Sequence, residues 1–177
     1  MLNTVHTLLR AARQEDIPSR FIWFNDPEFT RLYLGRTVPT SYEQIEGEVK
    51  FSLQPFSLTS LLEFSIQTIA DERYIGSTFL RKINWPDRHA EFGIFIGPRE
   101  LWGGQLGTEV TQTMIRYAFR ELGLHRLWLT VLAYNHRAVR CFERCGFRKE
   151  AVFREVLYAG GIYNDVIGMS ILEGEMN

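Results

Sequence analysis

The sequence has few cysteines, almost no excess charge and no long apolar run. Its 177 residues include two cysteines, Cys141 and Cys145, which stand four positions apart. Two cysteines at this spacing do not make a disulfide framework, and they supply too few ligands for a structural zinc site. A reduced, cytoplasmic protein without a metal is therefore expected. No apolar run approaches the roughly 20 residues of a membrane span. His6, Arg10 and Arg13 interrupt the N-terminal segment, which argues against a signal peptide.

Positive and negative side chains almost balance. There are 20 Lys and Arg against 21 Asp and Glu, a formal net charge of −1. A nucleic-acid binder held by bulk charge is therefore not expected. A hydrophobic content of 45% with 23% charged residues is typical of folded globular proteins. The length suits one domain with its own core, and we expect a single domain over residues 1–177.

Hydrophobic periodicity predicts a mixed α/β fold. Helix start signals stand at Asp16, at Asp26 before Pro27, at the overlapping capping boxes that begin with Thr40 and Ser41, and at Asn135. The predicted order is β–α–α–β–β–β–α–β–α–β–β, with an antiparallel meander in the middle, a right-handed parallel crossover after it, and frayed residues at 173–177. The predicted strands are 5–12, 61–69, 74–83, 89–96, 124–131, 147–157 and 163–172, the last two joined by a turn at Gly160-Gly161.

A glycine-rich turn stands where the strand period gives way to a helical period. Trp102-Gly103-Gly104-Gln105-Leu106-Gly107-Thr108 follows the strand at 89–96 and precedes an amphipathic helix that Gly123 ends. The first N–H groups of a helix are unpaired and lie at the positive end of its dipole, so they attract phosphate. The sequence therefore predicts that this turn cradles a pyrophosphate.

The N-terminal third is unusually aromatic. Core packing is the favoured interpretation, and the wall of a substrate pocket is the alternative. The aromatic residues are Phe21, Trp23, Phe24, Phe29, Tyr33 and Tyr42.

Four segments in this order resemble the GNAT N-acetyltransferase superfamily: 90–96, 102–109, 135–142 and 145–147. A closing Tyr163-Asn164-Asp165-Val166 resembles the branch with ribosomal-protein N-terminal, spermidine and amino-sugar acetyltransferases. In the family the middle of the turn is glycine, whereas this chain has Gln105. Gly104 is the expected source of the backbone freedom that the turn then needs.

The resemblance implies an enzyme that moves an acetyl group from acetyl-CoA to a primary amine. The amine, on a protein N-terminus, a polyamine or an amino sugar, would attack directly in a ternary complex, without a metal or a covalent intermediate. A homodimer is common among such relatives. Besides the turn from Trp102 to Thr108, the residues expected at the cofactor are Phe95, Ile96, Asn135, Arg137, Ala138, Arg140 and Phe142.

Three residues are catalytic candidates by resemblance. Glu91 is the candidate general base, with a structural salt bridge or an orienting role as the alternative. Asn135 is expected to contact the pantetheine, and its local role is a helix N-cap. Many relatives carry Tyr as general acid where this chain has Phe142, so the adjacent Cys141 is a candidate, with a small buried hydrophobe as its favoured interpretation.

Two further classes of function stay open, and the acceptor is undecided. One is a GNAT-fold module that binds acyl-CoA without catalysis, suggested by Gln105 and Phe142, and the other is an acyl enzyme on Cys141. An acidic rim of Glu43, Glu46 and Glu48 would suit a cationic acceptor, although a solvated helix face explains it as well. Tyr163 and Asp165 are acceptor contacts by resemblance alone.

Overall fold

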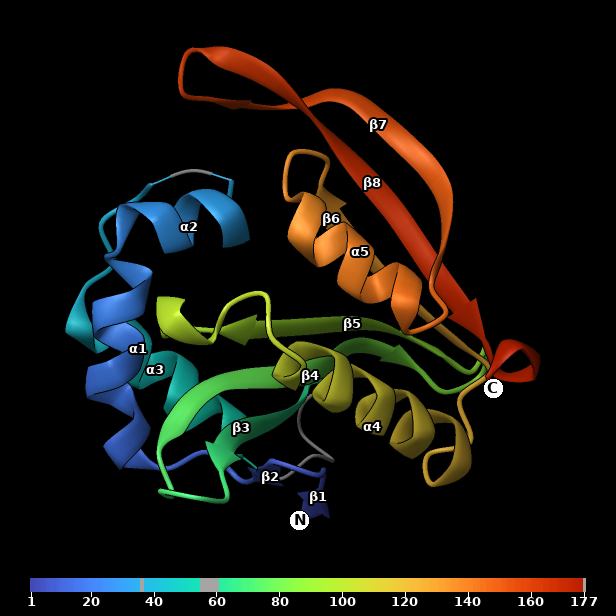
Figure 1. Cartoon of the computed structure of the whole chain (residues 1–177), viewed down its shortest axis with the longest axis horizontal. Coiled ribbons are helices and arrows are strands. Elements are labelled where there is room, and N and C mark those ends of the chain that lie inside the picture. The colour runs from blue at the N-terminus through green and yellow to red at the C-terminus, as the bar shows by residue number, and fades with distance from the viewer. Residues whose placement is uncertain (36, 55–60, 177) are drawn as a thin grey trace.

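The computed structural model describes residues 1–35, 37–54 and 61–176, and the strands in these ranges form one eight-stranded sheet. The strand order across it is β1-β2-β3-β4-β5-β6-β8-β7 (Figure 1). The strands are β1 Leu2–Asn3, β2 Thr7–Arg10, β3 Leu62–Thr68, β4 Tyr74–Asn84, β5 His89–Ile96, β6 Arg126–Leu132, β7 Arg148–Ala159 and β8 Ile162–Leu172.

The predicted topology of the sheet is confirmed. Strands β3, β4 and β5 form the antiparallel meander, and β6 returns parallel to β5 after a helix. β7 and β8 form the closing hairpin, with Gly160 and Gly161 at φ 62° and 80°. Left-handed backbone at both positions is the reason for this glycine pair, because other residues are strained there.

The N-terminal region contains the three helices that the start signals at Asp16, Asp26 and Thr40–Ser41 predicted, although the predicted order counted two. One further strand, β1, pairs antiparallel with β2 and was not predicted. The α-helices of the described residues are α1 Ile17–Phe24, α2 Pro27–Tyr33, α3 Tyr42–Ser52, α4 Leu106–Arg120 and α5 His136–Arg144.

The predicted caps of these helices hold in part. Asp26 accepts a hydrogen bond from the backbone of Phe29 at 2.8 Å and so begins α2 as predicted. Ser41 and Gln44 form the reciprocal box that begins α3. Asp16 stands at the N-cap of α1, but its carboxylate makes no cap bond. It is buried in an ion pair with Arg10 instead, and this tertiary contact outweighs the local signal.

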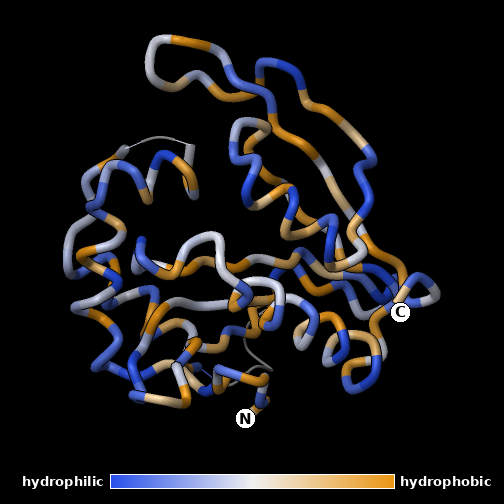
Figure 2. The backbone as a smooth tube through the Cα atoms, in the orientation of Figure 1, coloured by the Kyte–Doolittle hydropathy of each residue, from blue (hydrophilic) through white to orange (hydrophobic). Residues whose placement is uncertain are grey.

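Two hydrophobic clusters lie on the sheet. The larger joins the central strands to α4 and α5, and the smaller joins α1, α2 and α3 around Phe95 of β5. The aromatic N-terminal residues thus pack largely as core, in agreement with the favoured interpretation. In Figure 2 the tube of β5 is mostly orange to tan where it crosses the middle of the molecule. β5 is therefore covered on both faces, and it carries residues of the site on each.

β5 and β6 part soon after they pair. Their parallel register covers only 89–91 against 126–128, although β5 continues to Ile96 and β6 to Leu132. Beyond this point the two strands splay, and α2 lies across the opening from α5 (Figure 1). The cleft that results is the position of the site.

The C-terminal residues differ from the frayed end predicted for 173–177. A short 3-10 helix covers Glu173–Glu175, and the backbone N–H of Glu173 donates to His125 at 2.9 Å. Residue 177 lies outside the described ranges. Within those ranges, no helix combines the length and apolarity needed to cross a bilayer.

Candidate active site

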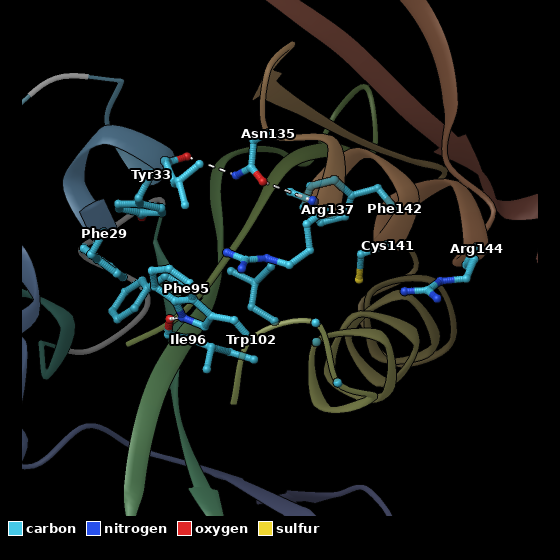
Figure 3. Close-up of a pocket in the computed structure, with 16 residues that line it drawn as sticks. Phe29, Tyr33, Phe95, Ile96, Trp102, Asn135, Arg137, Cys141, Phe142 and Arg144 are labelled. Carbon is cyan, nitrogen blue, oxygen red and sulfur yellow. Dashed lines mark hydrogen bonds between the residues drawn. The ribbon is translucent and has the colours of Figure 1, made fainter. Parts of the chain in front are cut away.

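A first cavity of about 760 Å³ lies where β5 and β6 part. Residues of α2 form one wall, β5 and the glycine turn form the base, and α5 forms the other wall (Figure 3). Its only charged lining side chains in the described chain are Arg137 and Arg144. The lining comprises Phe29, Leu32, Tyr33, Ile94, Phe95, Ile96, Trp102, Gly103, Gly104, Gly107, Asn135, Arg137, Ala138, Cys141, Phe142 and Arg144.

A second cavity of about 1100 Å³ continues from the first on the side of β6, β7 and β8. Its walls are mostly aliphatic and aromatic. Arg81 and Glu91 are its only charged lining residues in the described ranges. Six residues line both cavities and so mark their junction: Leu32, Tyr33, Ile94, Asn135, Ala138 and Phe142.

Asn135 joins the two walls of the cleft. Its Oδ1 accepts from the backbone N–H of Ala138 at 3.2 Å, which is the predicted N-cap of α5. Its Nδ2 donates to the carbonyl of Leu32 in α2 at 3.1 Å. Next to it, the Tyr134 hydroxyl donates to the carbonyl of Arg31 at 2.7 Å. These bonds fix α2 against α5 across more than one hundred residues of sequence.

The geometry of the glycine turn explains the departure at Gln105. Gln105 has φ −82°, an ordinary right-handed value, so glycine is not needed there. Gly103 has φ 80° and supplies the left-handed residue that was expected from Gly104. Gln105, the N-cap residue of α4, forms no side-chain hydrogen bond to the first turn of that helix, whose backbone N–H groups lie at the start of the helix dipole.

Trp102 closes the turn against β5 and holds an arginine. Its indole N–H donates to the carbonyl of Ile96 at 2.7 Å. The guanidinium of Arg137 lies 4.4 Å from the centre of the indole ring, a cation–π contact. Burial lowers the pKa of Arg137 somewhat, while Glu28 opposes that shift. The first cavity thus has the guanidinium of Arg137, fixed by Trp102, near the start of α4.

Glu91 is buried, with 4% of its surface exposed. It was predicted on the polar face of β5, but that face is covered too. Arg81, its cross-strand partner, donates from Nη2 at 2.5 Å, and Lys82 Nζ lies 2.9 Å from the other carboxylate oxygen. Burial alone would raise the pKa of Glu91, but the two cations outweigh it and the pKa is lowered.

A β-bulge allows both cations to reach the same carboxylate. Consecutive strand residues ordinarily point to opposite faces of a sheet. The register of β4 against β5 shifts between Arg81 and Asn84, and Lys82 has a left-handed φ of 51°. The bulge redirects Lys82, and its ammonium also lies 5.3 Å from the ring centre of Trp128.

Cys141 lines the first cavity at the side of the glycine turn. Its sulfur lies 3.5 Å from the hydroxyl of Thr108. The neighbouring Cys145 thiol lowers the pKa of Cys141 to about 6, with support from Thr108 and Arg144 and against the effect of burial. The pKa of Cys145 is raised in return. Cys141 is not among the residues at the junction.

The structure brings most of the predicted residues to the cleft. Phe95, Ile96, Trp102, Gly103, Gly104, Gly107, Asn135, Arg137, Ala138, Cys141 and Phe142 line the first cavity, and Glu91 lines the second. Gln105, Leu106, Thr108 and the exposed Arg140 line neither. Sequence reasoning did not assign Leu32, Ile94 or Arg144 to the site. Phe29 and Tyr33 belong to the aromatic residues for which a pocket wall was the alternative interpretation, and their helical spacing of four was the signal that places them on one side of a helix.

The chain matches the family described as acetyltransferase (GNAT) domain over residues 6–148. It belongs to that family. The predicted family, the mixed α/β fold and the class of acetyl-CoA-dependent N-acetyltransferase are thereby confirmed.

Two relatives share part of the sequence, and a solved structure shares the fold. An uncharacterized N-acetyltransferase of Bacillus subtilis, YoaA, is 28% identical over 98% of this chain and 97% of its own. A spermidine N(1)-acetyltransferase of Vibrio cholerae is 36% identical over 60% of this chain and 61% of its own. A crystal structure of the Vibrio cholerae spermidine N-acetyltransferase with CoA and spermine superposes with a TM-score of 0.84 at 27% identity, covering 96% of each chain.

Proposed function

We propose that this protein acetylates a primary amine by direct attack, with acetyl-CoA in the first cavity and the amine entering through the second. The observation that carries the proposal is the junction, where two cavities of different chemistry share six lining residues. Two reactants held on either side of a common point are oriented for reaction, which lowers the entropic barrier.

The residues of the first cavity fit acetyl-CoA. Arg137 and Arg144 supply positive charge for phosphates, and the uncapped start of α4 supplies backbone N–H groups. Gly107 lines this cavity beside Cys141 and Ile96 without a side chain of its own. When bound, acetyl-CoA supplies the activated acetyl group as a thioester.

The charges and apolar walls of the second cavity favour some amine acceptors over others. A polyamine is recognised by several carboxylates, and among the described lining residues Glu91 is the only one. That carboxylate already faces Arg81 and Lys82, so the cluster of three carries a net positive charge. The apolar walls suit a peptide N-terminus with hydrophobic neighbours better than a polycation. We therefore place a peptide α-amine ahead of a polyamine and an amino sugar.

Glu91 is proposed to orient the acceptor rather than to take its proton. A carboxylate whose pKa is lowered is a weaker base than an ordinary glutamate, and the acceptor amine is far more basic than either. A Glu91→Gln variant should then lose affinity for the acceptor and keep the shape of its pH profile. Loss of the acidic limb of the kcat profile in this variant would restore Glu91 as the base.

An amine panel with a free-thiol readout tests the function. The purified chain is given acetyl-CoA with spermidine, glucosamine or a short peptide that begins with a free, apolar residue. We expect turnover that is fastest with the peptide. Binding of acetyl-CoA by calorimetry without turnover on any of the three amines would favour the non-catalytic acyl-CoA-binding module, which the buried Phe142 in place of the family tyrosine motivates.

A further inference from the structure

The junction of the two cavities contains one side-chain proton donor that has no partner. Of the six residues that line both cavities, Leu32, Ile94, Ala138 and Phe142 are apolar. The side-chain amide of Asn135 already accepts a hydrogen bond from the backbone N–H of Ala138 and donates one to the carbonyl of Leu32. The hydroxyl of Tyr33 makes no hydrogen bond to any group of the described chain.

We propose that Tyr33 of α2 is the proton donor to the leaving sulfur in the acetyl transfer. The inference rests on the proposed function, since it assumes that the thioester meets the amine at the junction. Phe142 of α5 cannot give a proton, and it lines the same junction from the opposite wall. α2, on one wall of the cleft, thus supplies the proton donor that α5, on the other wall, lacks.

The surroundings of Tyr33 hold its ring firmly and keep its hydroxyl protonated. The ring packs against Phe24, Phe29 and Phe95, with centres 5.8, 5.5 and 5.4 Å away. Burial raises the pKa of Tyr33 to about 12, more than the nearby Arg81 and Arg20 lower it. At neutral pH the phenol therefore carries its proton. Cys141 is less suited, because it lies beside the glycine turn and does not line the junction.

The proton balance of the step is complete with Tyr33. The C–N bond forms as the C–S bond breaks, the nitrogen gives up one proton and the sulfur needs one. Tyr33 gives its proton to the sulfur as the bond breaks. It then regains one from the amine nitrogen through water in the open second cavity. No oxidant, metal or other reactant enters the step.

The test compares Tyr33→Phe with Tyr42→Phe. Both keep the aromatic ring, but Tyr42 is exposed on α3 and lines neither cavity. With the best amine of the panel, we expect Tyr33→Phe to lower kcat by about 10²- to 10³-fold, a usual share for general acid catalysis, with KM for acetyl-CoA within about threefold. Tyr42→Phe should match the unmodified enzyme.

A binding measurement separates proton donation from a structural role. Calorimetry with CoA at pH 7 and pH 9 should show that Tyr33→Phe weakens binding about fivefold more at pH 9, where the thiolate forms and needs a donor. Desulfo-CoA, which lacks the sulfur, should bind both proteins equally. Equal weakening toward CoA and desulfo-CoA, or an unchanged kcat, would overturn the proposal. An unmodified chain that binds CoA but acetylates no amine would sink the proposed function instead, while the CoA measurement still decides Tyr33.

Discussion

Replacing Glu91 by Gln isolates the contribution of one buried charge to stability. Glutamine has nearly the same shape, so packing against β4 and β6 is kept and only the charge is lost. A charge-assisted hydrogen bond contributes roughly 1.5–3 kcal/mol, and an exposed ion pair about 0.2–1 kcal/mol. Glu91 is buried, but Arg81 and Lys82 are 50% and 65% exposed and are rehydrated once released. The expected loss at pH 7 therefore lies between these limits, at about 1–2 kcal/mol.

The pH dependence of that loss has a definite sign. The pKa of Glu91 is lower in the folded chain, so the unfolded chain binds the proton more tightly. The ion pair therefore stabilises the fold fully above the ordinary glutamate pKa of about 4.3. This stabilisation disappears as the pH falls through the lowered pKa of the folded state. The difference in free energy of unfolding between the unmodified chain and the Glu91→Gln variant should shrink over the same pH range.

Urea unfolding followed by tryptophan fluorescence measures this difference at pH 7 and at steps down to pH 3. Glu46→Gln is the matched control, because Glu46 is a partly exposed carboxylate that pairs with Lys50 at 3.1 Å on the surface of α3. The Glu46→Gln substitution should lower the free energy of unfolding by less than about 0.5 kcal/mol. A Glu91→Gln loss that is the same at every pH would refute the reasoning, since packing rather than charge would then be responsible.

Three further changes test the packing and the first cavity. A Cβ at Gly97 would lie 1.9 Å from the indole of Trp23. Gly97→Ala should therefore lower the free energy of unfolding by about 2–4 kcal/mol, measured by thermal unfolding. An unchanged Tm would contradict this close approach of the indole. Trp102→Leu removes the stacking partner of Arg137, and calorimetry should show about tenfold weaker acetyl-CoA binding, with kcat kept. Alkylation of Cys141 by iodoacetamide should rise through about pH 6 and be suppressed by CoA; reaction only above pH 8 would argue against the lowered pKa.

Much of the fold and part of the site could be read from local signals. The alternation at 89–96 defines β5, and the helical stripe after the glycine turn defines α4, because these periods are carried by the residues themselves. Asp26 and Asn135 cap their helices with bonds that span three residues. The order of four such segments was enough to indicate the family, and with it the acetyl donor.

Other features follow only from contacts between distant parts of the chain. Asp16 carries a cap signal, yet Arg10 and a buried environment determine its role. Glu91 alternates as a surface residue would, and only the cross-strand Arg81 and the bulge that redirects Lys82 make it an ion-paired carboxylate in the interior. The left-handed residue of the turn is Gly103 rather than Gly104, which adjacent glycines do not reveal by themselves.

By itself, then, the sequence determined seven of the eight strands, most of the helix caps, the glycine-rich turn before α4 and the family. The tertiary structure alone decided that Tyr33 of α2, Asn135 at the N-cap of α5 and Phe142 of α5 come together in the lining that the two cavities share. That meeting depends on the splaying of β5 from β6 and on a bond from Asn135 to Leu32 across 103 positions. Periodicity and capping are properties of a few neighbouring residues, whereas such a junction results from packing the whole chain.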